Sequence, residues 1–280
     1  MAGRWRGPIN ESPVCERSPV VPKTRRKDAS QREATETLRL LFEQDRERVF
    51  YSRQLEVLHE AKWFHWITNR ALRDLIARGE ISDEVRSLKT GGSIHLMWNS
   101  KYRYYRRKAD QLVKLVEAYA SPNIGGALGL HGEALVLEGF AKKQFVLIGR
   151  DTRMYKGVVW VGSEHDLDFI FERDGIAYGV EVKNSLGYMD YDELVIKIAL
   201  CDELGIRPVF AVRFLPKSWV KEVVDAGGFA LIFKYQLYPW SYRELAGRVR
   251  DELGLPVDTP RALEEGTMDR FTNWHERQTV

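Results

Sequence analysis

The sequence predicts an α/β protein in which a mixed β-sheet follows a smaller helical domain. Between about residues 31 and 105, apolar residues recur at helical spacing in three successive segments, and two alternating strands follow them. From about residue 126, helical segments instead alternate with short apolar strands. A chain of 280 residues with 44% hydrophobic residues has enough apolar content to build a core in one large domain or in two modest ones.

Positive charge is concentrated in two stretches of the chain. The net charge is only +3, but residues 1–30 carry +4 and residues 100–115 carry +5, which leaves −6 for the remainder. Such clustering is typical of a protein that binds an anionic polymer. The longest apolar runs fall far short of the roughly 20 residues that a membrane helix needs. We therefore expect a cytoplasmic protein that makes no contact with a membrane.

The first half of the chain predicts an arm, three helices and a hairpin. Residues 1–30 are rich in Pro, Ser and Arg and predict a flexible basic arm. Helical spacing then begins at residue 31, and a second helix begins near Ser52, which is a plausible N-cap. A third helix in "ITNRALRDLIARGEI" ends before Gly79. The segment "EVRSLKTGGSIHLMW" predicts a β-hairpin that turns at residues 89–93.

This order of three helices and a β-ribbon, over residues 31–105, resembles the winged-helix family of DNA-binding domains. In that family the third helix enters the major groove and the ribbon forms a wing. The resemblance implies DNA contacts for the side chains of Asn69, Arg70 and Arg73 on the helix, and of Arg86 and Lys89 on the wing. Two alternatives stay open, because such side chains can be merely solvated and winged helices also bind other proteins.

Residues 106–125 predict a basic linker helix, introduced by the segment "KYRYYRRKADQLVK". Arg103, Arg106 and Arg107 lie around its start, where they could bind phosphates and release counterions. The interleaved tyrosines could instead pack the two domains against each other. The stretch "SPNIGG", residues 121–126, predicts a linker before the second domain.

The second domain is expected at residues 126–250, and residues 251–280 predict a C-terminal tail without an assigned role. Its helices are expected at residues 128–143, 191–204 and 216–226. Its strands are expected at 144–149, 157–162, 166–172, 177–183, 207–214 and 229–237. Trp274 suggests that the tail docks somewhere, for example on a second subunit.

The two strands on either side of Asp174-Gly175 carry charged residues at positions that should be buried. An Asp-Gly pair favours a two-residue hairpin turn, and that turn fixes the register of the strands. It places Asp168 opposite Glu181, on the same face as Lys183. Two converging carboxylates repel each other unless a cation lies between them. Mg²⁺ fits there, with the backbone carbonyl of Val182 as a third ligand.

Asp168, Glu181 and Lys183, with Glu133 on a preceding helix, resemble the PD-(D/E)xK nucleases over about residues 126–238. This superfamily includes restriction endonucleases and archaeal Holliday-junction resolvases. The resemblance implies that Glu133, Asp168 and Glu181 are catalytic metal-site acids, and that Lys183 orients or helps to deprotonate the attacking water. Leu167 stands where the proline of the motif would be. Together the two resemblances imply a mixed-sheet restriction-endonuclease-like core preceded by a smaller winged-helix domain.

The expected function is that of a Mg²⁺-dependent DNA endonuclease, in which Mn²⁺ can replace Mg²⁺ and no organic cofactor takes part. Cutting both strands of a duplex requires two sites, so we expect a homodimer. The winged helix followed by such a core also resembles Mrr-like type IV restriction enzymes, although those carry Gln where this chain has Glu181. The alternative is a DNA-binding regulator or assembly subunit that uses a nuclease-like scaffold without turnover. RNA also remains open as the substrate.

Overall fold

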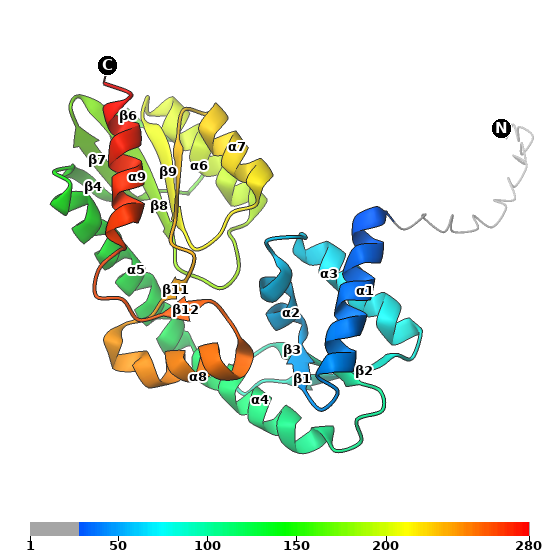
Figure 1. The fold of residues 1–280 in the computed structure, drawn as a ribbon. Helices are drawn as coiled ribbons and strands as arrows, with labels where there is room; N and C mark the ends of the chain where they lie inside the picture. Colours follow the sequence, from blue (N-terminus) through cyan, green and yellow to red (C-terminus); the bar gives the residue numbers. More distant parts are fainter. Residues whose placement is uncertain (1–27, 280) are drawn as a thin grey trace, which may run out of the picture.

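The computed structural model describes residues 28–279, which form an α/β protein built from two units (Figure 1). Within residues 29–99, three helices pack on a three-stranded antiparallel sheet of order β1-β3-β2. Its elements are α1 (Ala29–Gln44), β1 (Val49–Tyr51), α2 (Ser52–His59), α3 (His65–Ala77), β2 (Ile81–Ser87) and β3 (Ser93–Asn99). Most of the predicted basic arm, residues 1–27, lies outside the described residues. Helix α1 begins earlier than expected, because the side chain of Asp28 caps it by accepting from the backbone N–H of Gln31.

The larger unit is a five-stranded mixed sheet of order β10-β9-β8-β7-β4. Strand β7 pairs antiparallel with β4 and β8, whereas β8, β9 and β10 run parallel to one another. The elements up to the central hairpin are α4 (Tyr105–Tyr119), α5 (Pro122–Lys142), β4 (Val146–Thr152), β5 (Met154–Tyr155), β6 (Val158–Val159), β7 (Leu167–Arg173) and β8 (Ile176–Lys183). Those after it are α6 (Tyr191–Glu203), β9 (Arg207–Val212), α7 (Lys217–Asp225), β10 (Phe229–Ile232), β11 (Gln236–Leu237), the 3₁₀ turn η1 (Trp240–Tyr242), α8 (Arg243–Leu253), β12 (Val257–Asp258) and α9 (Glu265–Glu276).

The hairpin between β7 and β8 has the predicted register. Asp174 and Gly175 both have positive φ angles, 52° and 76°, as a two-residue turn of this kind requires. The pairing runs from the turn to Phe169 and Val180, and ends one pair before Asp168 and Glu181. The register prediction is therefore confirmed along the ladder that leads to the charged residues.

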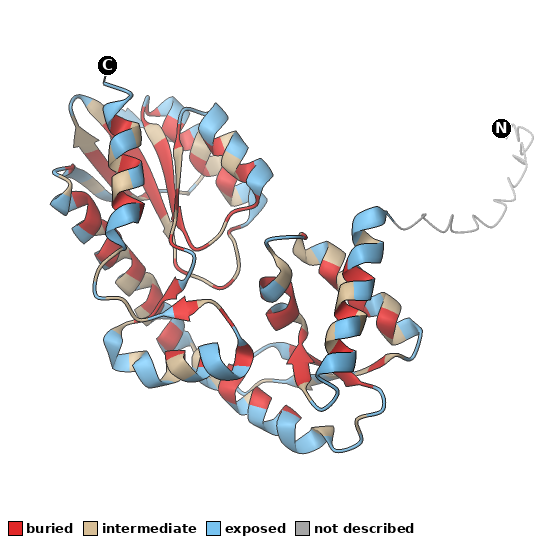
Figure 2. Cartoon of the chain, viewed as in Figure 1, coloured by how far each residue is buried: buried red, intermediate tan, exposed pale blue. Residues whose placement is uncertain are grey.

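Helices cover both faces of this sheet, and the strands between them are buried along most of their length (Figure 2). Helices α5 and α9 pack on one face, where Phe140 and Phe271 meet Tyr178. Helices α6 and α7 pack on the other face, where Leu194 and Trp219 share a cluster with residues of β9. None of the helices in residues 28–279 combines the length and the apolar content needed to cross a membrane.

Three predicted boundaries are wrong. The predicted linker helix, residues 106–125, is split between α4 and α5, and the "SPNIGG" linker is the beginning of α5. Pro122 is the first residue of that helix. A backbone N–H at this position would have no partner within the helix, so proline is well tolerated there. The predicted strand at 229–237 is interrupted by Lys234, whose positive φ ends β10 before the short β11 begins.

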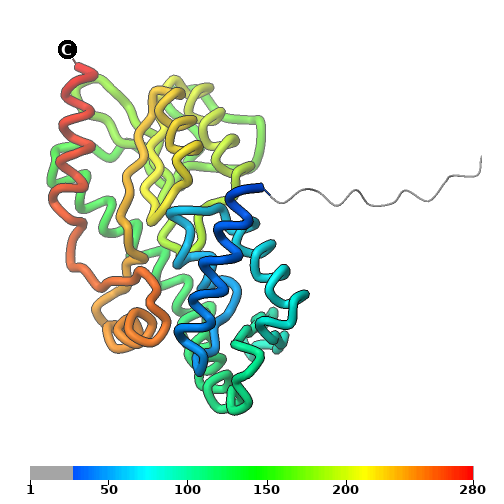
Figure 3. Tube along the Cα trace, turned by 45° about the vertical axis from the view of Figure 1, so that its right-hand side comes forward, coloured from blue at the N-terminus to red at the C-terminus, as the bar shows by residue number. Residues whose placement is uncertain are grey.

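The C-terminal residues belong to the core as far as they are described. Helix α8 lies against α4 below the larger unit (Figures 1 and 3), and its residues Val249 and Leu253 share a core cluster with Leu112 and Leu115 of α4. Helix α9 lays Phe271 and Trp274 on the large sheet. Trp274 thus docks on its own chain, with its ring 5.9 Å from that of Tyr178, so the sheet of this chain provides the docking surface.

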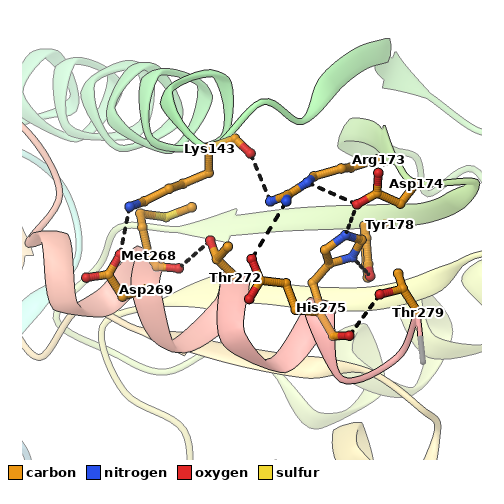
Figure 4. A network of polar contacts seen from close by, with 10 residues as sticks. Lys143, Arg173, Asp174, Tyr178, Met268, Asp269, Thr272, His275 and Thr279 are labelled. Atoms are coloured by element: carbon orange, nitrogen blue, oxygen red, sulfur yellow. Dashed lines mark hydrogen bonds and ion pairs between the residues drawn. The ribbon is translucent and has the colours of Figure 1, made fainter.

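Polar contacts fasten α9 to the turn of the central hairpin (Figure 4). His275 is fully buried, with its Nδ1 2.6 Å from the Tyr178 hydroxyl and its Nε2 3.0 Å from Asp174 Oδ2. Arg173 lies 3.2 Å from the same carboxylate, and the hydrogen bond with His275, followed by the charge of Arg173, lowers the pKa of Asp174. The C-terminal helix therefore supports the turn that sets the strand register.

A buried ion pair joins the two units. The Arg213 guanidinium, after β9, makes a two-pronged contact with the Glu60 carboxylate at the end of α2, with Nη2 and Oε2 2.6 Å apart. It also donates to the backbone carbonyls of Ser185 and Leu186, in the loop that follows β8. Arg213 is only 2% exposed.

Replacing Arg213 by Ala should lower the free energy of unfolding by about 3 to 5 kcal/mol, because Glu60 and two carbonyls would stay buried without a partner. Urea denaturation measures the change. Arg78→Ala is the control, since Arg78 is half exposed and lies 3.6 Å from its partner Glu80. It should cost no more than about 0.5 kcal/mol. Similar losses in both variants would contradict a special role for the buried pair.

Candidate active site at the fork between two strands

The charged residues lie where β7 and β8 separate. The pairing of β7 with β8 ends at Phe169 and Val180. Before Phe169, β7 pairs only with β4, to Leu167. After Val180, β8 pairs only with β9, to Lys183. The opening is closed by Asp168, whose Oδ2 accepts from the backbone N–H of Val182 at 2.6 Å. Because the N–H and C=O of a strand residue point to the same side, the carbonyl of Val182 also faces this fork.

Helix α6 supplies charges that complement those of β8. Glu181 and Lys183 are two apart on one face of the strand, and Glu193 and Lys197 are four apart on one face of the helix. Lys197 Nζ lies 2.6 Å from Glu181 Oε2, and Lys183 Nζ lies 3.2 Å from both carboxylate oxygens of Glu193. The four side chains thus form two crossed ion pairs.

Lys197 does not extend its charge to solvent, although it stands alone among apolar residues of its helix. The residue is only 4% exposed, and its ammonium group also donates to the carbonyl of Asp166. Sequence reasoning missed Glu193 entirely. The signal was present in the i, i+4 spacing of Glu193 and Lys197, which repeats the Glu-then-Lys order of Glu181 and Lys183 on β8.

A glycine lets α6 come close enough for these contacts. A Cβ atom on Gly179 would lie 2.6 Å from Cys201 Sγ and 2.7 Å from Leu167 Cδ1, closer than atoms can pack. Any larger side chain here would push α6 outward. The burial of Lys197 against Glu181 therefore depends on the absence of a side chain two residues earlier on the strand.

Asn184 anchors the end of β8. Its side-chain amide donates to the carbonyls of Leu128 in α5 and Leu237 in β11, and its Oδ1 accepts from the N–H of Leu237. The contact with α5 is tight, because a Cβ on Gly132 would lie 2.7 Å from the Cβ of Asn184. Lys183 therefore emerges from a fixed backbone position. Sequence reasoning also missed this residue, whose partners are about fifty residues away on each side.

Both carboxyl groups at the fork resist ionisation. Burial raises the pKa of Asp168 to about 6, with the charges of Glu133 and Asp166 adding to the rise and the N–H of Val182 opposing it. Burial, followed by the charge of Asp168, raises the pKa of Glu181 to about 7 in spite of Lys197. The mutual repulsion expected from the sequence is thus present.

Glu133 and Asp166 do not join Asp168 and Glu181 in one tight group of carboxylates. Glu133 lies near the fork, where its charge acts on Asp168, but its Oε2 accepts from Arg150 at 2.9 Å. Asp166 is exposed, and Lys183 pairs with Glu193 instead of with Asp166. The hairpin register alone would set Asp166 opposite Lys183, but α6 supplies the ion-pair partner of Lys183 instead.

The donor set fits a divalent cation that keeps part of its water shell. Within residues 28–279, no three side chains of His, Cys, Asp or Glu are arranged to hold a metal ion by themselves. Mg²⁺, however, is commonly held by one or two carboxylates together with waters and substrate phosphates. Two carboxylates and the Val182 carbonyl suffice for that. The charged groups around the fork are acids Glu133, Asp166, Asp168, Glu181 and Glu193, and bases Arg150, Lys183 and Lys197. With all of them ionised, the acids outnumber the bases and favour a cation.

The residues predicted to contact DNA fall into two groups. Arg70, Arg103, Arg106 and Arg107 are exposed and form no ion pair within residues 28–279. Arg73 donates only to a carbonyl of its own helix. These guanidinium groups are available to phosphates.

Two of the other predicted DNA contacts, Asn69 and Arg86, are engaged inside the protein, whereas the Lys89 side chain is exposed and forms no ion pair within residues 28–279. Asn69 donates to Glu56 at 2.8 Å. Arg86 lies 2.6 Å from Asp110 of α4. The backbone N–H of Lys89, at the tip of the hairpin, donates to Glu117 of α4 at 2.8 Å. The hairpin is therefore folded back on α4 and presents less free positive charge than a projecting wing.

The tyrosines at the start of α4 differ in burial, and two of them take the packing role that was left open. Tyr105 stacks on Trp98 with a ring distance of 3.8 Å, and Tyr102 packs beside the same cluster. Tyr104 instead is 83% exposed, next to Arg103 and Arg106 in a surface groove. Tyr102 and Tyr105 therefore pack inside the protein, whereas the ring of Tyr104 is accessible to a ligand.

The raised pKa values predict that stability falls as the pH rises from about 4 to about 7. In this interval the folded protein keeps protons on Asp168 and Glu181 that the unfolded chain, with ordinary pKa values near 3.8 and 4.5, releases. The loss should be on the order of 3 kcal/mol for each group. Urea denaturation across this range measures it. Saturating Mg²⁺ should restore stability at high pH, because it binds the ionised carboxylates.

The double variant Asp168→Asn, Glu181→Gln should lack most of this slope and most of the response to Mg²⁺. Asp192→Asn, an exposed change at the start of α6, should retain both. An unchanged slope in the double variant would mean that these carboxylates are not the groups that titrate.

Comparisons with known proteins add little. No known protein family and no curated protein match the sequence. The structure is similar to the crystal structure of protein VC1899 from Vibrio cholerae, with 14% sequence identity and a TM-score of 0.28. The similarity covers 88% of this chain and 52% of the other, so this chain spans about half the length of that protein. A likeness this distant indicates neither a shared fold nor a shared activity.

Proposed function

We propose that the protein is a Mg²⁺-dependent endonuclease that hydrolyses phosphodiester bonds in DNA. The single observation that carries the proposal is the fork, where Asp168 and Glu181 act on each other electrostatically and Lys183 lies on the same strand face as Glu181. Buried acids that repel each other cost stability. Their presence together is explained if a cation and a phosphate are to be bound there.

The surrounding elements support a restriction-endonuclease-like core. Helix α5, the antiparallel strands β4, β7 and β8, helix α6 and strand β9 follow in the order that the PD-(D/E)xK resemblance implies. Asp168 lies near the beginning of the second of these strands, and Glu181 and Lys183 at the end of the third. Residues 29–99 have the helices and hairpin of a winged helix, with the short β1 as a third strand.

Asp168, Glu181 and the carbonyl of Val182 would hold Mg²⁺, and Mn²⁺ could replace it. When bound, the ion supplies positive charge to the phosphate and makes a nearby water more acidic. Glu133 could bind a water of the ion if its contact with Arg150 were released.

The side chains of this protein have separate roles in the proposed reaction. Lys183 can orient a water or stabilise the negative charge that develops on the phosphate, because its ammonium group is partly exposed and held by Glu193. Lys197 keeps the Glu181 carboxylate turned toward α6. It acts as a positioning residue, since it is buried behind the carboxylate.

The free arginines of α3 and of the start of α4 would bind the DNA backbone. Phosphate contacts position a duplex without reading its sequence. Asn69 and Arg86 contribute less to this interface because their side chains are already paired, whereas the exposed ammonium group of Lys89 can add to it. Cleavage of both strands would require two such sites, and a homodimer provides them.

One observation favours a non-catalytic DNA-binding subunit as the second candidate. Lys197 and Arg150 already neutralise Glu181 and Glu133, as they would in a scaffold that needs no metal. The fork would then be a structural charge cluster. Cleavage assays separate the two candidates.

The full chain with Mg²⁺ should cleave plasmid or branched DNA, and Asp168→Asn, Glu181→Gln and Lys183→Met should each reduce the rate at least about 100-fold. Asp192→Asn should cleave normally. The appearance of nicked and linear products on gels measures the rate, with matched RNA tested alongside DNA. If neither Mg²⁺ nor Mn²⁺ supports cleavage that these variants lose, the scaffold proposal replaces the enzyme.

The variant Arg106→Gln, Arg107→Gln should bind DNA less tightly, and the slope of log K against log salt should become shallower by about 2. Fluorescence anisotropy in the absence of metal measures both quantities. Arg248→Gln is the matched control, because this exposed arginine of α8 is already paired with Glu252. Equal slopes for both variants would remove α4 from the DNA interface.

A further inference from the structure

A second cavity lies between the two units, away from the fork. It has a volume of about 350 Å³ and lies between the α2–α3 connection and the segment that joins β9 to α7. This volume falls within the range of about 300 to 1,000 Å³ typical of small-molecule sites. Its walls come from both units, so a ligand here would touch the N-terminal unit and the large sheet at once.

The walls are aromatic. Trp63, Phe64, Tyr188 and Phe214 all line the cavity, and the last three are partly exposed to it or to solvent. The rings of Tyr188 and Phe214 are 6.1 Å apart and inclined to each other. Aromatic walls that keep an exposed face favour a flat, conjugated ligand that can stack on them.

The rim is positively charged. Lys62 and Lys217 line the cavity from opposite units, and neither forms an ion pair within the described part of the chain. Helix α7 begins at the same wall with Lys217 and Ser218, after Pro216, and no side chain caps its first turn. The N–H groups of Lys217 and Ser218 at this helix start and two ammonium groups without an ion pair, one of them over the Trp63 ring, favour an anion.

We propose that this cavity binds a nucleotide, with its base against the aromatic rings and its phosphate between Lys62 and Lys217. A flat ring joined to an anionic group is the ligand chemistry that satisfies both the walls and the rim. The nucleotide could be a free mononucleotide or an unstacked nucleotide of a bound nucleic-acid strand. Glu60 does not oppose the phosphate, because Arg213 neutralises it.

The cavity also has a physical connection to the fork. Tyr188 belongs to the loop that leads from Lys183 to α6, and its hydroxyl contacts His65 at the beginning of α3. A ligand that stacks on Tyr188 therefore touches the segment that connects the two crossed ion pairs. The proposal of a nucleotide site does not depend on nuclease activity.

Binding is tested with the full chain in EDTA, so that no cleavage can interfere. Equilibrium dialysis measures the affinity for the common ribo- and deoxyribonucleotides, with inorganic triphosphate as the probe that lacks a base. A short single-stranded oligonucleotide that carries a fluorescent base analogue reports an unstacked base. Lys62→Gln combined with Lys217→Gln should weaken binding at least about tenfold. Phe214→Leu, which keeps the apolar volume but removes the ring, should weaken it about fivefold or more.

Lys221→Gln is the matched control, since this lysine lies on α7 outside the cavity and is exposed. It should bind as the unchanged protein does, and circular dichroism confirms that each variant is folded. Lysine-dependent binding of mononucleotides would identify a free nucleotide as the ligand, and binding of the oligonucleotide alone would identify the nucleic-acid strand. If neither binds in a manner that depends on Lys62, Lys217 and Phe214, or if triphosphate binds as tightly as nucleotides, the proposal is overturned.

Discussion

The pairing register of β7 and β8 decides on which side of the sheet each charged side chain at the fork lies. A shift by one residue would move Glu181 and Lys183 from the α6 face to the α5 face, where Phe140 and Phe271 form an apolar core. The turn at Asp174 and Gly175 fixes the register locally, and α9 supports it through His275. The C-terminal helix places no charged side chain at the fork. It contributes to the site indirectly, because it supports the turn at the far end of the hairpin.

The crossed ion pairs between β8 and α6 explain how buried charges are tolerated there. A lone buried carboxylate is costly, and a buried pair is tolerated when its geometry is good and its other atoms are satisfied. Lys197 meets this condition, with one contact to Glu181 and another to the carbonyl of Asp166. Among the described residues, Asp168 accepts a hydrogen bond only from a backbone N–H, and its burial raises its pKa in spite of that bond. The unbalanced group at the fork is therefore Asp168, which is where an added cation would gain the most electrostatic stabilisation.

The features that the sequence predicted are those fixed by short-range rules. A two-residue turn sets the strand register whatever surrounds it, and this allowed the approach of Asp168 to Glu181 to be predicted. The contacts of Lys197, Asn184 and Arg213 could not be predicted, because each depends on how an element distant in sequence is placed in space. The role of residues 251–280 was missed for the same reason. Their apolar residues are few and irregular, and become informative only once the open face of the sheet is known.

The contacts of Arg213 link the position of the N-terminal unit to the backbone beside the fork. Its guanidinium holds Glu60 of one unit and the carbonyls of Ser185 and Leu186 of the other. Those carbonyls lie two and three residues after Lys183, in a loop that Asn184 fastens on its other side. A rotation of the N-terminal unit would therefore have to break a buried ion pair or to pull on this loop. Since either change is costly, the free arginines of α3 and the fork should keep a fixed separation. In the proposed nuclease, that separation would determine how far from the bound backbone a cut is made.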